Sequence, residues 1–288
     1  MTIGINKYQL DTPCLVIDLD KLIRNIVRMQ KFATDQNILV RPHAKTHKCS
    51  KIAKLQQQYG AVGICVAKVS EAYELAKAGV TNILITSPVV TENKIQTLLK
   101  VLELAPETMV VVDHIDNAVL LNSKMVKNRL NILLDIESGL LRTGVLPDKA
   151  VKTALEINQL RQLNFRGIQC YAGHLQHIKD FEDRKSQSKA VLQKASEIKA
   201  QLLQEGIACH IQTGTGTGTF AIDAEVESVT EIQPGSYVVM DKEYLDIDYG
   251  KEEIFEQAMT MLTTVISANH DTHVTVDAGT KEIGRAHV

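Results

Sequence analysis

The chain has 288 residues, of which 44% are hydrophobic and 23% are charged, and its formal net charge is −2. This balance is typical of a soluble globular protein, and it excludes a strong overall field for nucleic acid or an anionic membrane. No apolar run approaches the roughly 20 residues of a membrane span, and the first residues carry no signal-peptide pattern. The five cysteines are scattered, without a CxxC spacing. We therefore expect a cytoplasmic protein with no nucleic-acid or membrane partner.

Short β-branched runs alternate with amphipathic segments along most of the chain. A strand-like piece at residues 14–19 precedes a helix at 21–33, and another helix is predicted at 70–78, where Gly79 ends it. The longest helix is predicted from about residue 181 to 205 and closes at Gly206. Strands are predicted at residues 38–42, 63–66, 82–86, 109–113, 131–136, 167–171, 210–212 and 237–240.

Strands that alternate with helices in this way favour an α/β fold with a closed (β/α)₈ TIM-like barrel. An open doubly wound sheet gives almost the same pattern and is the alternative. After Gly250 the pattern changes, because residues 259–268 and 273–277 are predicted to be consecutive strands with no long helix between them. We expect a barrel over residues 11–250 and the start of a second, β-rich domain over 251–282.

The last residues, 283–288, resemble a translated sequencing adapter. Our hypothesis is that native sequence ends near Lys281 or Glu282. A longer reading frame from the source that continues with the same residues past Glu282 would contradict it. For this reason His287 is excluded from any site.

The densest chemical cluster is Arg-Pro-His-Ala-Lys-Thr-His-Lys at residues 41–48, directly after the first barrel strand. In barrel enzymes this end of the strand lies at the catalytic face. In an extended run, His43, Lys45 and His47 would point the same way. Cationic neighbours and a partly dry site would lower the pKa of Lys45 and free its amine to attack an aldehyde. A solvated basic loop or a phosphate-contacting patch explains the same residues equally well.

A second segment alternates threonine and glycine over residues 213–219, after the seventh strand. Alternating glycines let backbone N–H groups turn toward one anion, and threonine hydroxyls add donors. The loops after strands seven and eight are the usual phosphate site of barrels. Gln-Pro-Gly-Ser-Tyr at residues 233–237 could supply further donors. The alternative, a flexible low-complexity linker, is disfavoured by the apolar strands on both sides.

Two other strand ends carry candidate side chains. Arg142 follows the fifth strand, and taken alone it is best explained as a surface arginine that pairs with Glu137. Tyr171 closes the sixth strand and is expected to face the barrel mouth. His174 and His177 lie three residues apart and could bind a metal or transfer a proton, although such a pair is more often structural.

Together these segments bring a lysine, an arginine, a tyrosine, a histidine and an anion-binding loop to one face, as bound pyridoxal phosphate requires. The sequence resembles the fold-type III pyridoxal-phosphate enzymes of the D-threonine aldolase and D-serine dehydratase-like family, whose barrel is similar to the alanine racemase N-terminal domain. The string at residues 41–48 is the specific match. Supporting matches are Asp11-Thr12-Pro13, Gly63-Ile64, Ser70-Glu71-Ala72, residues 135–144, 171–177, 213–219 and 234–237, and Val276-Asp277-Ala278-Gly279.

The resemblance implies a role for each matching residue. Lys45 would carry pyridoxal 5′-phosphate as a Schiff base, with His43 also at the cofactor. Arg142 would face the pyridine nitrogen and keep it unprotonated, and Tyr171 would lie against the cofactor. His177 matches the position that, in the aldolases, takes the β-hydroxyl proton. The phosphate would be held by Thr215, Gly216, Thr217 and Tyr237.

The implied activity is a lyase reaction that cleaves β-hydroxy-D-amino acids to glycine and an aldehyde, as in D-threonine aldolase. The alternative is β-elimination of the D-serine dehydratase type, with Lys45 as the base at Cα. A non-catalytic pyridoxal-phosphate homeostasis protein or an amino-acid racemase is a further alternative. The family also uses a divalent metal, Mn or Zn, held by its C-terminal domain, so we expect no metal ligands in this chain. A small D-amino acid is the expected substrate, and barrels of this type commonly form homodimers.

Overall fold

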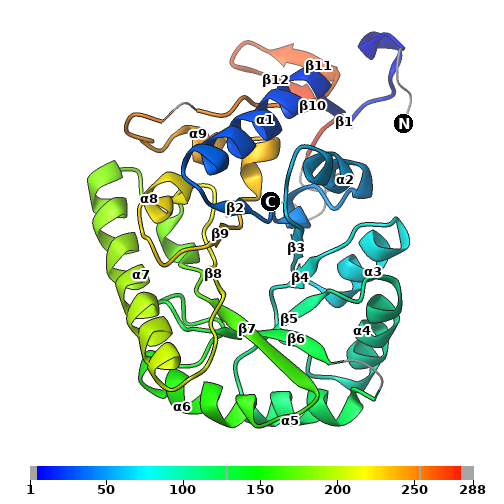
Figure 1. Ribbon diagram of the computed structural model, residues 1–288. Helices are drawn as coiled ribbons and strands as arrows, with labels where there is room; N and C mark the ends of the chain where they lie inside the picture. The colour runs from blue at the N-terminus through cyan, green and yellow to red at the C-terminus, as the bar shows by residue number, and fades with distance from the viewer. Residues whose placement is uncertain (1–4, 127–128, 253, 280–288) are drawn as a thin grey trace.

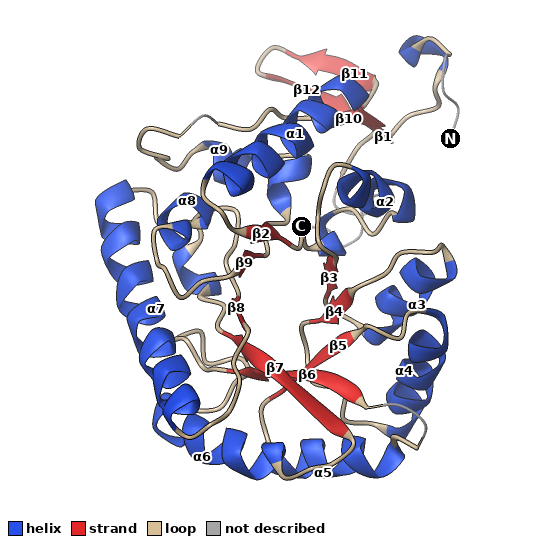
Figure 2. Cartoon of the chain, viewed as in Figure 1, coloured by secondary structure: helices blue, strands red, loops and turns tan. Residues whose placement is uncertain are grey.

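The fold is a parallel barrel surrounded by helices (Figures 1 and 2), seen in a computed structural model that describes residues 5–126, 129–252 and 254–279. Each barrel strand is short, and most are followed by a helix that returns the chain to the start of the next strand. The barrel strands are β2 (Leu39–Val40), β3 (Ile64–Val66), β4 (Ile83–Ile85), β5 (Met109–Val112), β6 (Leu130–Asp135), β7 (Leu163–Gln169), β8 (Ile211–Thr213) and β9 (Glu231–Ile232).

The ring of strands closes through one strand pair and a few single contacts. Strands β3 to β8 form one sheet in sequence order, and β2 pairs in parallel with β9. An isolated parallel bridge between His43 and Cys65 joins β2 to β3. The Gln233 N–H donates to the Thr215 carbonyl, and this bond joins β9 to β8. The structure thus confirms the (β/α)₈ barrel that the sequence predicts.

Nine α-helices of the described residues and four short 3₁₀ turns complete the barrel region and its N-terminal edge. Aspartates cap the two longest helices, because Asp18 accepts the Lys21 N–H and Asp180 accepts the Asp183 N–H. None of the described helices is both long and apolar enough to cross a membrane. The helices are α1 (Leu19–Asp35), α2 (Ser50–Gln58), α3 (Val69–Lys77), α4 (Glu92–Leu104), α5 (Ile115–Lys124), α6 (Pro147–Asn158), α7 (Phe181–Gln204), α8 (Phe220–Ala224) and α9 (Lys242–Leu245). The 3₁₀ turns are η1 (Lys7–Gln9), η2 (Ala44–Thr46), η3 (Gly173–Leu175) and η4 (Ser236–Val238).

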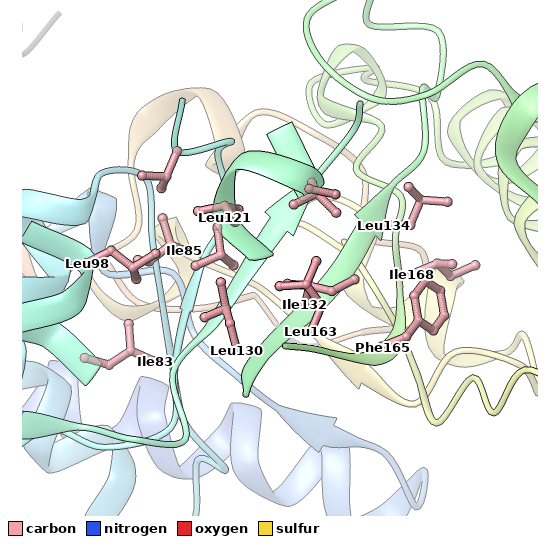
Figure 3. Packing of buried hydrophobic residues seen from close by; sticks show 14 of the residues in the cluster. Ile83, Ile85, Leu98, Leu121, Leu130, Ile132, Leu134, Leu163, Phe165 and Ile168 are labelled. Atoms are coloured by element: carbon pink, nitrogen blue, oxygen red, sulfur yellow. The ribbon is translucent and has the colours of Figure 1, made fainter. Parts of the chain in front are cut away.

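The main hydrophobic core lies between the strands and the surrounding helices (Figure 3). Side chains alternate along a strand, so that Ile83 and Ile85 of β4 face the helices while Leu84 belongs to a separate cluster with Cys65 and Val111. That smaller cluster lies inside the barrel. The barrel is therefore a filled core, and only the end at which the strands finish remains open for a site.

The predicted eighth strand at residues 237–240 is wrong. The structure places the last barrel strand earlier, at β9, and residues 236–238 form the turn η4. Tyr237 and Val238 are buried together with Leu22 and Ile26 of α1 in a second hydrophobic cluster. Their apolar character therefore reflects packing under α1, and a short apolar run does not distinguish this from a strand.

Within the residues that the structure describes, four strands lie outside the barrel: β1 (Cys14–Ile17), β10 (Met259–Leu262), β11 (Val265–His270) and β12 (His273–Val276). β1 pairs antiparallel with β10, and β11 forms a hairpin with β12. The single strand predicted over 259–268 is wrong, because Asp277 accepts hydrogen bonds from the Thr263 hydroxyl and the Thr264 N–H and interrupts it. The tail predicted at residues 283–288 lies outside the described residues.

Candidate active site

A cleft opens where the barrel strands end, as expected for this architecture. Its empty volume is about 760 Å³, counting the part that is open to solvent. Six predicted site residues line it, namely His43, Lys45, Arg142, Tyr171, Gly216 and Thr217. Three others do not line it, namely Thr215, His177 and Tyr237. The structure therefore brings the lysine, the arginine, the tyrosine and the threonine-glycine loop together around one space.

Lys45 projects into this cleft beside one aromatic side chain, Tyr171, and one cationic side chain, Arg142. Its Nζ lies 5.1 Å from the centre of the Tyr171 ring, and the Arg142 guanidinium lies 5.5 Å from the same centre. Partial burial lowers the pKa of Lys45, and the nearby Arg142 charge lowers it further. Both causes disfavour the ammonium form, so the amine is more available as a nucleophile than an ordinary surface lysine.

His43 is fixed in a neutral form on the cleft wall. Its Nδ1 accepts the Lys45 backbone N–H at 3.2 Å, and its Nε2 lies 3.1 Å from the Thr86 hydroxyl. Because that hydroxyl donates its own proton to the Val66 carbonyl, Nε2 must carry the imidazole hydrogen. Burial lowers the pKa of His43 well below its ordinary value, in agreement with this assignment. Both ring nitrogens are therefore engaged in shaping the wall.

The expectation that His43, Lys45 and His47 point the same way is wrong. Residues 44–46 form the turn η2, so the alternation of an extended strand does not apply. His47 instead accepts the Cys49 N–H at its Nδ1, and burial lowers its pKa to about 4. It belongs to the support of the lysine loop, while His43 and Lys45 line the cleft.

A bidentate ion pair lies under the lysine loop. Arg41 Nε is 2.9 Å from Glu231 Oε1, and the side chains are only 5% and 2% exposed. The pair joins β2 to β9, the two strands that complete the barrel. Removing one partner of such a pair leaves a buried charge and destabilises strongly. The arginine that opens the specific sequence string therefore has a structural role, below the cleft.

The threonine-glycine loop faces the cleft with backbone groups. In the described chain, the N–H groups of Gly216, Thr217 and Gly235 make no hydrogen bond inside the protein. All three residues line the cleft, together with Ser236. Converging N–H groups form an anion-binding concavity. We define the phosphate cradle as the cleft-facing backbone of residues 216–217 and 235–236.

Tyr237 and Thr215 lie next to the cradle without lining the cleft. The Tyr237 phenol is 1% exposed and accepts a hydrogen bond from Gln56, while its backbone N–H donates to the Thr217 hydroxyl. Thr215 is buried with its hydroxyl beside the Asp223 carboxylate. Both residues support the cradle from behind, and their direct contact with a phosphate stays a prediction, as does the contact of Arg142 with a ring nitrogen.

His177 lies next to Tyr244, a residue that lines the cleft. The two rings are 4.4 Å apart, and Nδ1 of the 46% exposed His177 lies 3.7 Å from a Glu243 carboxylate oxygen. His174 instead lies against Gly139. In the described ranges, no three His, Cys, Asp or Glu side chains are arranged to hold a metal ion. Partial exposure and a carboxylate neighbour are compatible with a proton-transfer role for His177.

Sequence reasoning missed a polar wall of the cleft. Gln233 donates to the Gln169 side-chain carbonyl, and Gln169 donates to the buried carboxylate of Asp135. Burial raises the pKa of Asp135 to about 6, although Gln169 and Thr143 both donate to it. Gln169 and Asp135 are the last residues of β7 and β6. Polar residues at the ends of predicted strands were the available signal in the sequence, but they are neither basic nor aromatic and did not stand out as candidates.

Comparison with known proteins assigns the chain to a family. It matches the alanine racemase N-terminal domain over residues 17–243. The chain belongs to this family. It is 37% identical over 277 residues to D-threonine aldolase from Arthrobacter sp., covering 95% of this chain and 73% of that protein. It is 35% identical over 290 residues to 3-hydroxy-D-aspartate aldolase from Paracoccus denitrificans (strain Pd 1222), covering 96% and 74%.

A solved structure of D-threonine aldolase from Filomicrobium marinum resembles the chain with a TM-score of 0.91 and 38% identity. The match covers 94% of this chain and 73% of that one. These relatives confirm the resemblance that the sequence motifs predict. The chain spans about three quarters of the length of each.

Proposed function

We propose that this chain is a pyridoxal-phosphate-dependent lyase that cleaves β-hydroxy-D-amino acids between Cα and Cβ. One observation carries the proposal: a lysine with a lowered pKa faces the same cleft as a cradle of unused backbone N–H groups. An amine for an aldehyde and a cradle for a phosphate are the two groups that pyridoxal phosphate requires. The named activities of the relatives, two D-hydroxy-amino-acid aldolases, support the reaction class.

The residues of the cleft fit this cofactor. Lys45 offers the nucleophilic amine, and the cradle offers neutral donors for the phosphate. Tyr171 offers a ring face in the same cleft, and Lys45 Nζ and the Arg142 guanidinium lie 5.1 and 5.5 Å from its centre. When bound, pyridoxal phosphate supplies an electron-poor ring conjugated to the substrate amine, and this ring holds the electron pair left on Cα.

Each side chain then has a separate task. Lys45 would hold the cofactor through its amine, and the same amine could move a proton at Cα of the substrate. His43 keeps the lysine loop in place through the Lys45 N–H. Arg142 already lines the cleft, with its guanidinium 5.5 Å from the centre of the Tyr171 ring, and would offer positive charge at the cofactor. Tyr171 packs against the ring and excludes water from one face.

His177 is the proposed base for aldol cleavage. It takes the proton from the substrate β-hydroxyl, so that the Cα–Cβ bond breaks as the carbonyl of the leaving aldehyde forms. A Glu243 carboxylate oxygen lies 3.7 Å from His177 Nδ1. The described residues do not fit a divalent metal ion, and none of these steps depends on one. We propose that Mn or Zn, where the reaction uses it, takes its ligands outside them, in a C-terminal β-domain that begins at residues 251–282.

The test is product identification. The protein is supplied with pyridoxal phosphate and D-threonine, with and without Mn²⁺. Acetaldehyde and glycine are expected, and 2-oxobutanoate with ammonia would instead establish β-elimination and contradict the role of His177. Borohydride reduction followed by peptide mapping is expected to find the cofactor on Lys45. A protein that gives no adduct at Lys45 would overturn the proposal, and an adduct without either product would indicate another D-hydroxy amino acid or a non-catalytic binder.

A further inference from the structure

Gln176 makes three hydrogen bonds that connect Gly218 and Thr219, which directly follow the cradle residues 216–217, to the loop before α7. Its Oε1 accepts the Gly218 N–H at 2.9 Å, and its Nε2 donates to the Thr219 hydroxyl at 3.1 Å and to the Ala172 carbonyl at 3.3 Å. The side chain is only 1% exposed. A buried amide with every group engaged fixes the position of whatever it bonds.

Gly216 and Gly218 lie so close to Gln176 that a side chain at either position would collide with it. A Cβ atom added at Gly216 would lie 2.2 Å from Gln176 Oε1, and one added at Gly218 would lie 2.1 Å from the Gln176 carbonyl oxygen. Neither glycine has a φ in the left-handed region, so backbone conformation alone does not demand glycine there. At Gly216 all three of the nearest contacts are side-chain atoms of Gln176. The close approach of this amide therefore explains the glycine.

The far side of Gln176 is anchored as well. Thr219 donates to Asp223, and Asp223 accepts in turn from Ser188 of α7. Arg184, also in α7, donates through Nε to the Gly218 carbonyl. These bonds tie residues 218 and 219 to α7 and α8, and Gln176 bonds the same two residues from the loop before α7.

We propose that Gln176 is a positioning residue for the phosphate subsite: its amide consumes the Gly218 N–H and leaves those of Gly216 and Thr217 to face the cleft. This inference rests on the proposed function, because it assigns the cradle to the phosphate of the cofactor. Gln176 itself is absent from the lining of the cleft. Its effect reaches the ligand through the backbone that it holds.

The first test compares two ligands that differ only in the phosphate. Pyridoxine 5′-phosphate and pyridoxine lack the aldehyde, so their binding does not involve capture by Lys45. In Gln176→Leu, calorimetry is expected to show pyridoxine 5′-phosphate bound about tenfold more weakly, the loss that one or two hydrogen bonds of a preorganised site represent. The affinity for pyridoxine is expected to stay within about twofold. Equal weakening of both ligands, or no weakening of either, would overturn the proposal.

A double-mutant cycle provides a second test that does not depend on the fold of one variant. Gly216→Ala alone is expected to weaken pyridoxine 5′-phosphate because the new Cβ meets Gln176 Oε1. In the Gln176→Ala background that contact is gone, so the added Gly216→Ala change is expected to cost little. Simple additivity of the two losses would show that Gln176 does not set the loop, and would contradict the proposal.

The matched control is Asn122→Ala. Asn122 is also a side-chain amide that accepts a backbone N–H, here that of Gln162 at 2.9 Å before β7 begins, at the other end of the barrel. Its removal is expected to leave the ratio of the two affinities unchanged, and a changed ratio would overturn the assignment to Gln176. A wild-type protein that discriminates the two ligands but forms no borohydride adduct at Lys45 would retain this inference while ending the proposed function.

Discussion

The two loops that face each other across the cleft are built on opposite principles. The lysine loop, residues 41–48, concentrates charged and titratable side chains, and burial together with nearby cations lowers the pKa of both His43 and Lys45. The threonine-glycine loop, residues 213–219, has no charged side chain, and it is anchored through its own backbone atoms and hydroxyls. The first loop is tuned electrostatically and the second is tuned by shape.

This difference separates reactivity from binding. Substituting a side chain in the lysine loop changes which protonation state is present, whereas adding one atom to the threonine-glycine loop changes where the N–H groups point. The two loops should therefore fail in distinguishable ways. Four substitutions test the contrast, from the largest expected effect to the smallest.

Lys45→Ala removes the only nucleophile that the proposal uses for the cofactor. Lyase activity is expected to fall by at least about a thousandfold, as when a covalent catalyst is lost. Binding of pyridoxine 5′-phosphate is expected to survive, because the cradle is intact. Steady-state rates with D-threonine and calorimetry of the phosphate ligand are the measurements. Loss of both together would show that the two loops are not independent.

Gly218→Ala is expected to have the opposite effect, because it disturbs the binding loop and leaves Lys45 in place. A Cβ at this position would lie 2.1 Å from the Gln176 carbonyl oxygen. This is a backbone atom, so a change of side-chain rotamer cannot relieve the clash. We expect a loss of about a hundredfold in affinity for pyridoxal phosphate, which corresponds to about 3 kcal/mol. The thermal midpoint is recorded beside it. Gly279→Ala, where a Cβ meets nothing within 4 Å, is the control and is expected to bind as the wild type does.

Asp223→Asn tests the buried carboxylate behind the cradle. Burial raises the pKa of Asp223 to about 6, from an ordinary value of 3.8. Between these values the folded protein binds more protons than the unfolded chain, so stability falls as the pH rises through that window. The total fall from this group is about 3 kcal/mol. Denaturant titrations at several pH values are expected to give a flatter profile in Asp223→Asn, and parallel profiles would contradict the assignment.

Arg142→Gln changes the charge beside Lys45. Because Arg142 lowers the pKa of Lys45, its removal is expected to raise that pKa. The amine reacts when deprotonated, so the pH profile for uptake of pyridoxal phosphate should move to higher pH. Stopped-flow absorbance gives the midpoint. Arg161→Gln, on the surface after α6, is the control, and an unmoved or lowered midpoint in Arg142→Gln would refute the charge effect.

The sequence predicted most of the barrel because its strands are short, buried and regularly separated by amphipathic helices. The strand prediction failed at residues 237–240, because the apolar side chains of Tyr237 and Val238 pack against α1 and do not belong to a strand. The sequence also predicted that His47 points the same way as His43 and Lys45, because a run of basic residues does not reveal the 3₁₀ turn η2. Gln169 was missed, since an uncharged amide carries no signal until its neighbours in space are known.

The antiparallel pairing of β1 with β10 bears on how the chain is made and cut. Residues 14–17 emerge early during synthesis, but their partners at 259–262 are made only after almost the whole barrel. Strand β1 therefore stays unpaired during synthesis until residues 259–262 have been made. Leu15 is exposed even in the finished fold. A protease cut after Gly250 would strip that strand of its partner. Strand β1, which lies outside the barrel and leads directly into α1, thus links the barrel region to β10, so trimming the chain at either end leaves one of the two strands unpaired.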